Sequence, residues 1–215
     1  LDVTVVIHWV NQNEFIITYS AVTDKTTLVN LTHHGFFSLS GIANPTASVE
    51  NNIVTINADF YTPMDNVSIP TGEIAKVEGT PMDFRTPHAV GSRINDKFEQ
   101  LEFGAGYDHA MYSINANKEP LALLLNVLNL KATQHGGLHY WTGCPSIYSQ
   151  LAQWLEGAHG ATFPARSAIC FEAQHFPDTP NKGHFPFLCI KTGRGIPTDN
   201  HLQIRRRKIS KTILK

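Results

Sequence analysis

The chain opens with residues that alternate between apolar and polar with the two-residue period of a β-strand. In VTVVIHW, the side chains of Val3, Val5, Ile7 and Trp9 fall on one face, and FIITYSA resumes the pattern after the polar turn NQNE. Two alternating runs joined by a short polar turn predict a β-hairpin.

Short extended runs continue along much of the chain. TTLVNLTHHGFFSLSG, NIVTINADFYTPMD, YDHAMYSI and SAICFEA have strand character, and IPTGEIAKVEGTPMDF between them is rich in turn-forming glycine and proline. The one candidate for an amphipathic helix is YSQLAQWLEG, Tyr148–Gly157. Many short strands separated by turns predict an all-β domain, either a sandwich or a barrel.

Composition indicates a globular chain without a general attraction to polyanions. The 215 residues suffice for one domain with a core, and charged residues make up 16% of them. The net charge of -1 and the short apolar run LALLLNVLNL argue against nucleic acid and membrane as partners. The basic end RRRKISKTILK alone would favour such a partner, and the overall charge outweighs it.

The cysteines and histidines do not predict a metal centre. Cys144, Cys170 and Cys189 lack metal-type spacing, and their odd number argues against a complete disulfide framework, so buried free thiols are expected. The 11 histidines invite proton chemistry, but a metal site needs three or four convergent ligands, and we expect none. Free thiols suit a reducing compartment, so a cytoplasmic location is expected.

The segment SAICFEAQHFPDTPN places chemistry at the end of a predicted strand. Glu172 is expected to lie exposed where that strand ends, and Pro177 and Pro180 are expected to hold the following loop as a wall of a site. Most glutamates near strand ends are simply solvated, so the residue needs support from other segments.

That support comes from four segments in a fixed order: Val29–Gly41, Ile56–Phe84, Gly106–Tyr112 and Ile169–Asn181. Together they resemble the aldose 1-epimerase (galactose mutarotase) family. The resemblance implies a large antiparallel β-sandwich, of which residues 1–215 would be the C-terminal portion as a single domain. The chain opens at Leu1 within a strand pattern and without a signal peptide, which indicates a piece of a longer protein. The absent N-terminal portion of the family carries an arginine and a histidine that hold the sugar, so the resemblance leaves open an active enzyme and an inactive fragment.

The resemblance also implies an activity, the interconversion of the α and β anomers of free hexoses such as galactose and glucose. A base removes the proton of the C1 hydroxyl while an acid protonates the ring oxygen, and no cofactor is required. Matched to the family's motifs, Glu172 is the base, His34 the acid and Asp108 a ligand of a sugar hydroxyl. Gln174 and His175 belong to the same motif as Glu172, and the resemblance implies either contact with the substrate or support of the residues that make it.

The motif around His34 departs from the family at three positions. His33 stands where the family usually has asparagine, Gly35 where it has serine or threonine, and Phe36 where it has tyrosine. Neighbouring hydrogen bonds orient such an imidazole, so these departures bear on its role as the acid.

Two other functions remain open on the sequence. One is a non-catalytic sugar-binding β-domain, in which Phe36, Tyr61 and Phe176 would stack on a sugar face. The other is an epimerase acting on a hexose phosphate, which would need cationic ligands for the phosphate.

Two segments, 121–153 and 195–215, do not match the family's strand pattern, and we hypothesise that they are frameshifted. A permitted set of codons for Gly195–Ile204, read with its first base removed, encodes EYRQTTTYKF, an alternating strand similar to the family's closing strand. The codons of the gene test this, since a shifted frame that encodes no such peptide would refute it.

Overall fold

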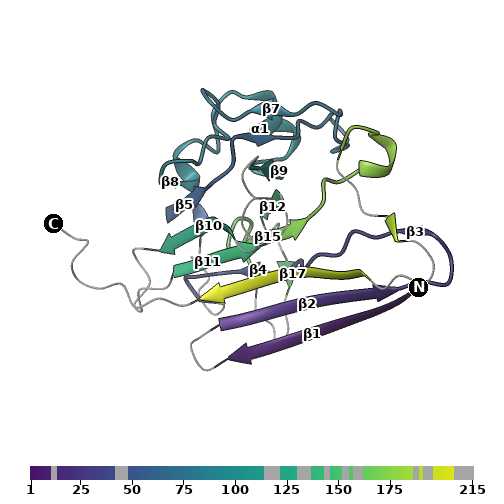
Figure 1. Ribbon diagram of the computed structural model, residues 1–215. Helices are drawn as coiled ribbons and strands as arrows, with labels where there is room; N and C mark the ends of the chain where they lie inside the picture. The colour runs from purple at the N-terminus through teal and green to yellow at the C-terminus, as the bar shows by residue number, and fades with distance from the viewer. Residues whose placement is uncertain are drawn as a thin grey trace.

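The structure is a computed structural model, in which most strands lie in two antiparallel sheets (Figure 1). It describes residues 1–10, 14–41, 48–113, 122–129, 137–142, 146–151, 155–156, 162–185, 189–190 and 196–205. Every strand pair with an assigned register is antiparallel, as the all-β prediction requires.

The larger sheet has seven strands and contains the predicted N-terminal hairpin. Its strands, in spatial order, are β1 (Asp2–Val10), β2 (Glu14–Val22), β17 (Ile196–Arg205), β11 (Gly137–Thr142), β10 (Ala122–Asn129), β5 (Asn52–Ile56) and β8 (His88–Ala89). Strands β1 and β2 pair along their whole lengths, from Asp2 opposite Val22 to Val10 opposite Glu14. The hairpin prediction is therefore confirmed.

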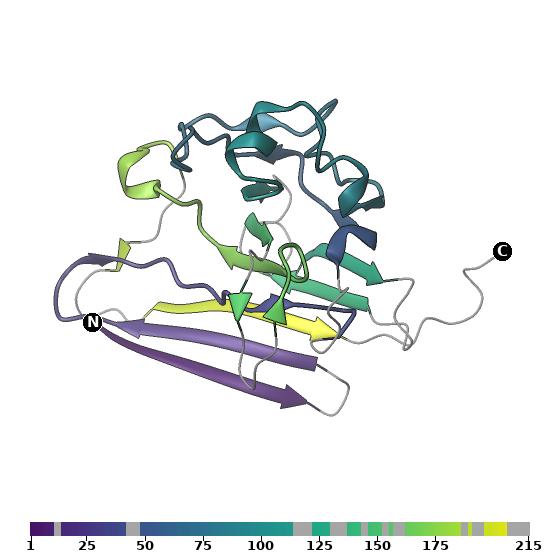
Figure 2. The ribbon, with the colours of Figure 1, turned by 180° about the vertical axis from the view of Figure 1, so that it is seen from behind.

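The smaller sheet has six strands and carries the segments with candidate chemistry. Its strands, in spatial order, are β4 (Phe36–Phe37), β15 (Ile169–Gln174), β12 (Ser146–Leu151), β9 (His109–Tyr112), β6 (Phe60–Tyr61) and β7 (Ala75–Lys76). Two-stranded pairs join β13 (Leu155–Glu156) to β14 (Thr162–Phe163), and β3 (Thr27–Leu28) to β16 (Cys189–Ile190). Figure 2 shows from behind how the loop-rich teal segment covers one end of the sheets.

Helical structure is sparse in the described parts of the chain. The α-helix α1 spans Glu99–Phe103, and single 3₁₀ turns span Val49–Asn51, Val90–Ser92 and Thr179–Asn181. The segment rich in glycine and proline, residues 69–84, was predicted to form turns, and it contains no helix.

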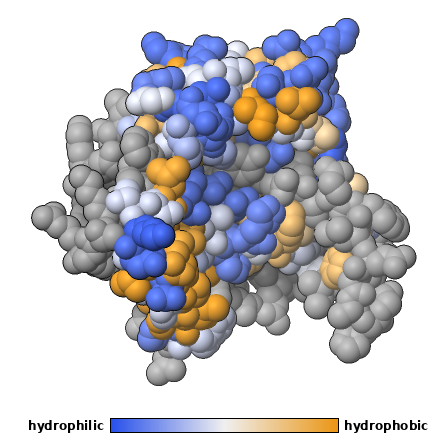
Figure 3. Space-filling model, turned by 90° about the vertical axis from the view of Figure 1, so that its right-hand side faces the viewer, coloured by the Kyte–Doolittle hydropathy of each residue, from blue (hydrophilic) through white to orange (hydrophobic). Residues whose placement is uncertain are grey.

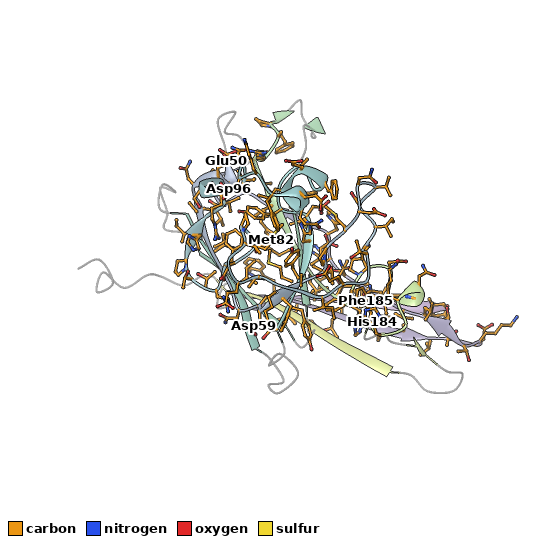
Figure 4. All side chains as sticks on the ribbon, turned by 90° about the horizontal axis from the view of Figure 1, so that it is seen from above. Glu50, Asp59, Met82, Asp96, His184 and Phe185 are labelled. Carbon is orange, nitrogen blue, oxygen red and sulfur yellow. The ribbon has the colours of Figure 1, made fainter. Side chains whose placement is uncertain are left out.

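The hydrophobic core lies between the two sheets. Strand β5 alternates, burying Val54 and Ile56, and these join Ile17 of β2 and Phe171 of β15 in one apolar cluster. Met82, from the turn-rich segment, is fully buried in the same cluster and lies amid the side chains in Figure 4. Two sheets sharing one core confirm the predicted sandwich.

The helix predicted over Tyr148–Gly157 is wrong. Residues 146–151 form β12, which pairs with β9 on one side and β15 on the other. A segment flanked by two strands satisfies its backbone hydrogen bonds in the sheet, and this outweighs a weak helical spacing. Parts of segments 121–153 and 195–215 lie outside the described residues, and the frameshift hypothesis stays a prediction.

One face of β1 is apolar and exposed. Val3, Val5 and Ile7 are each more than two-fifths exposed, although their alternation is typical of a strand with one buried face. In Figure 3, hydrophobic surface gathers in the lower part of the molecule, the side on which β1 and β2 lie in Figure 1. Among the described helices, none is long and apolar enough to cross a membrane.

Candidate functional site

Strand β15 divides its side chains between the core and the candidate site. Ile169 and Phe171 point into the core between the sheets and belong to its apolar cluster. Cys170, Glu172 and Gln174 alternate with them and therefore share the opposite face of the strand. The two-residue period of a strand thus presents three polar or nucleophilic groups on one side.

The pairing of β4 with β15 brings His34 to Glu172. In this antiparallel pair, Phe37 lies opposite Ile169 and Phe36 opposite Cys170, so the same register continued by two residues places position 34 opposite position 172. The His34 Nε2 and Glu172 Oε1 atoms are 3.3 Å apart. Two residues far apart in sequence are thereby joined by the local register of one strand pair.

The two members of this pair differ sharply in exposure. The side chain of His34 is 47% exposed, whereas that of Glu172 is 5% exposed. The expectation that Glu172 lies exposed at the end of its strand is therefore wrong. The residue sits two positions before the strand ends, between β4 and β12, with the imidazole over it.

Burial sets the protonation behaviour of Glu172. Removal from water raises the pKa of the carboxyl, and the nearby Asp108 carboxylate adds to this, while His34 and the thiol of Cys170 act in the opposite direction. Desolvation is the largest of these effects, so the pKa of Glu172 is higher than that of an ordinary glutamate. A carboxylate of raised pKa is a stronger base at neutral pH.

Cys170 is a free, fully buried thiol beside the carboxylate. Its Sγ donates to Glu172 Oε1 over 3.8 Å, and burial raises the pKa of the thiol. The free buried thiol predicted at this position is confirmed. Its contact with Glu172 was not predicted, although a spacing of two residues on a strand places both side chains on one face.

The local geometry before β4 links the two unusual residues on either side of His34. The backbone N–H of Gly35 donates to Nδ1 of His33 over 3.2 Å, and burial lowers the pKa of that imidazole. A Cβ on residue 35 would lie 2.2 Å from Cε1 of His33, a clash with the ring itself. With histidine at position 33 in this orientation, position 35 has to be glycine, so the two departures from the family pattern form one structural change.

Asp108 is held in place by a buried polar network. Its backbone N–H donates to Nδ1 of His109, whose Nε2 donates to Oε1 of Gln100 over 3.1 Å. Gln100 also exchanges two hydrogen bonds with the backbone of Met64. The neutral imidazole that this requires agrees with burial, which lowers the pKa of His109 to about 4. No pattern in the sequence marks His109 and Gln100 as supports of Asp108.

Pro177 lies close to Asp108. A small pocket is lined by both residues together with Thr62, Met64 and Ala110. The loop after β15 therefore approaches the segment that carries Asp108, in keeping with the expected wall.

Gln174 and His175 lie at the end of β15. Gln174 is on the same strand face as Glu172 and is partly buried. The backbone of His175 exchanges two hydrogen bonds with the side chain of Asn30, and burial lowers the pKa of its imidazole. These bonds hold the end of β15 against the segment that leads to His34.

Two of the three aromatic residues expected to stack on a sugar are buried. Tyr61 belongs to the main core, and Phe176 packs edge-on against Tyr112 and Phe185. Figure 4 shows Phe185 with His184 next to it. Phe36 is 39% exposed and its ring lies 5.2 Å from that of His34, so of these three aromatic residues it is the one that a ligand can reach.

The comparisons with known proteins agree with this architecture. A family model described as aldose 1-epimerase matches residues 1–203. The chain belongs to the aldose 1-epimerase family. It is 34% identical over 194 residues to galactose mutarotase of Bos taurus, covering 87% of this chain and 53% of the relative. The human galactose mutarotase is 35% identical over 187 residues, covering 84% and 51%.

A bacterial relative gives a similar match. The aldose 1-epimerase of Haemophilus influenzae is 33% identical over 190 residues, covering 84% of this chain and 52% of the relative. The chain thus spans about half the length of the curated relatives it matches.

Solved structures carry the same fold at lower sequence identity. An aldose epimerase homologue from C. elegans superposes with a TM-score of 0.81 at 21% identity, covering 96% of this chain and 59% of that one. Galactose 1-epimerase from Lactobacillus acidophilus gives 0.76 at 22% identity, covering 95% and 56%. The sandwich is therefore the galactose mutarotase fold, represented in part.

Proposed function

We propose that this chain is an aldose 1-epimerase that interconverts the α and β anomers of free hexoses, with Glu172 as general base and His34 as general acid. The observation that carries the proposal is the contact of 3.3 Å between a half-exposed imidazole and a buried carboxylate of raised pKa. An imidazole and a carboxylate are side chains that act as general acid and general base. The family implies a sugar as the substrate.

The proposed reaction balances without a cofactor. Glu172 accepts the proton of the C1 hydroxyl while His34, in its charged form, gives a proton to the ring oxygen. The bond between C1 and the ring oxygen breaks, and C1 becomes an aldehyde. After rotation about the C1–C2 bond, both proton transfers reverse and the ring closes to the other anomer.

The direct contact of the two groups has to open when sugar binds. The C1 hydroxyl and the ring oxygen would each take a hydrogen bond of about 2.7–3 Å from one of the two groups. His34 is the partner that can withdraw, since its side chain is 47% exposed while Glu172 is enclosed. Asp108 is proposed to bind a sugar hydroxyl, because an ionised acceptor forms the stronger hydrogen bond. Gln174 and His175 are proposed as further contacts at the end of β15.

Polarimetry on fresh α-D-galactose and α-D-glucose tests the proposal. The chain should accelerate mutarotation, and Glu172→Gln should reduce the catalysed rate by about 10²- to 10⁴-fold. Glu102→Gln, a matched change at an exposed glutamate of α1, should leave the rate unchanged. A folded chain that gives no acceleration, or an equal loss in both variants, would refute the assignment.

The hexose-phosphate alternative is examined by the same assay. Galactose 6-phosphate offered in place of galactose would be turned over faster if the site selects the phosphate. The sugar-binding alternative is weakened because two of the three aromatic residues expected to stack on a sugar are buried. Calorimetric titration of Glu172→Gln with galactose tests it, since this alternative requires binding that persists without catalysis.

A further inference from the structure

We propose that His34, Cys170 and Glu172 together bind Zn²⁺, and that the bound ion blocks the proposed acid/base pair. The imidazole, thiol and carboxylate each offer one ligand atom, and these atoms all lie within 4.8 Å of one another. No metal site was predicted from the sequence, because the cysteines lack the close spacing along the chain that is typical of metal ligands. Here two ligands come from β15 and the third, His34, lies two residues before β4.

The distances fit a tetrahedral zinc ion. With Zn–S of about 2.3 Å and Zn–N or Zn–O of about 2.0–2.2 Å, ligand atoms around the ion lie about 3.4–3.6 Å apart. His34 Nε2 and Glu172 Oε1 are 3.3 Å apart, and Cys170 Sγ and Glu172 Oε1 are 3.8 Å apart. Two of the three separations thus require changes of a few tenths of an ångström. The third, between an imidazole nitrogen of His34 and Sγ of Cys170, is at most 4.8 Å, and His34 is the half-exposed member of the three.

The chemistry of the ligand set selects the class of metal. A thiolate and an imidazole favour borderline or soft ions such as Zn²⁺ over Mg²⁺ or Ca²⁺, which prefer oxygen ligands. Asp108 places a second carboxylate near Glu172, which adds negative charge around the ion. Three protein ligands leave a fourth position open for water, the arrangement of an exchangeable site.

The burial of the ligands limits the route by which the ion reaches the site, and the bound ion would affect catalysis. Cys170 and Glu172 are enclosed, so the ion has to enter from the side of His34, the group proposed to withdraw when the sugar binds. A metal held by Glu172 and His34 leaves neither group free to move a proton. Zinc would therefore act as a reversible inhibitor; this consequence rests on the proposed function, whereas the binding itself does not.

The binding is tested with Co²⁺ as a spectroscopic substitute for Zn²⁺ on the full chain. One equivalent of Co²⁺ should produce a thiolate-to-metal charge-transfer band, and Zn²⁺ should displace it. Cys170→Ser should abolish the band and weaken Zn²⁺ binding at least about tenfold, since even residues that only support a metal ligand contribute that much. Cys189→Ser, the same change at the cysteine of β16, should keep both properties.

A second variant keeps the test decisive if Cys170→Ser does not fold. His34→Gln changes a half-exposed side chain and should weaken Zn²⁺ binding by a similar factor. Absence of the band in the unaltered chain, or equal Zn²⁺ affinity in His34→Gln, would overturn the site.

The inhibition is measured separately by polarimetry with added Zn²⁺. Half-maximal inhibition should occur at the Zn²⁺ concentration that half-saturates the site, and a chelator should reverse it. Metal binding in a chain without mutarotase activity would refute the proposed function and leave the metal site standing. Mutarotase activity in a chain that shows no Co²⁺ band would refute the metal site and leave the proposed function standing.

Discussion

At the scale of single residues, Glu172 serves two opposing requirements. Burial raises the pKa of its carboxyl, which makes it a better base, but the same burial penalises its charge in the folded state. Because the pKa is higher in the folded than in the unfolded chain, this group favours folding at low pH and opposes it as the pH rises toward neutrality.

Glu172→Gln should therefore stabilise the chain at neutral pH while it removes activity. The neutral amide occupies the same space without a buried charge, so the temperature of thermal unfolding at pH 7 should rise relative to the unaltered chain. Glu102→Gln is the control, since its carboxylate is exposed. A lower unfolding temperature for Glu172→Gln alone would show that the ionised carboxylate contributes to stability.

The side chain of His33 leaves no room for a Cβ at position 35, so these two positions depend on each other. Gly35→Ser places a Cβ against the His33 ring, and we expect a loss of about 1–3 kcal/mol in unfolding free energy, the usual cost of overpacking. The displaced segment carries His34, so mutarotation should fall as well.

The double variant His33→Asn with Gly35→Ser restores the usual family residues at both positions and should recover most of the loss. Urea unfolding and polarimetry on the two single variants and the double variant measure the coupling. Losses that simply add would show that the two positions are independent.

At the scale of elements, register explains the candidate site. The two-residue strand β4 is too short to be predicted from its own sequence, yet its pairing with β15 sets the position of His34 against Glu172. The resemblance to the family paired these two residues functionally, and the strand pairing supplies the physical reason for their contact. The same pairing adds Cys170, for which the family motif gave no role.

Strand β1 has the alternating apolar residues of a strand with one buried face, yet these residues are exposed. It is the first strand of the described seven-stranded sheet, and a long, exposed, apolar edge promotes pairing between chains. Two β1 strands paired antiparallel about Val5 would place Asp2 of each opposite His8 of the other, so the strand is complementary to itself.

Val5→Lys should reduce association of the chain with itself, because a charged side chain on an edge strand disfavours pairing. Sedimentation at increasing concentration measures the effect, and Val67→Lys, at an exposed valine outside the strands, is the matched control. Equal association in the two variants would show that β1 is not the surface involved.

At the scale of the whole molecule, buried histidines make stability depend on pH. Burial lowers the pKa of His109 from its ordinary 6.5 to about 4, so between these values the unfolded chain binds a proton that the folded chain does not. This contribution is complete above pH 6.5 and is lost as the pH falls to about 4, by about 3 kcal/mol. His33 and His175, whose pKa values burial also lowers, act in the same direction.

Urea unfolding at pH 7 and pH 4.5 should show this loss in the unaltered chain. His109→Gln keeps a side chain that can bond to Gln100 but cannot be protonated, so its stability should fall less between the two pH values. An equal fall in both chains would assign the acid sensitivity to other groups. The cytoplasmic location expected from the sequence stays a prediction.

The sequence by itself determined the N-terminal hairpin and the family. Alternation over 1–22 predicts the hairpin because a strand's period is a property of its own residues. The order of four motifs is enough to predict the sandwich and to nominate His34, Asp108 and Glu172. The helix predicted over Tyr148–Gly157 failed because both neighbours of β12 are distant in sequence, and pairing with them outweighs local propensity.

Only the tertiary structure decided burial and contact. It enclosed Glu172, buried Tyr61 and Phe176, and exposed the apolar face of β1, none of which a periodic pattern distinguishes. It also brought the imidazole of His34 to the thiol and carboxylate of β15. Such contacts depend on which strands become neighbours, and that choice is made by the packing of the whole chain.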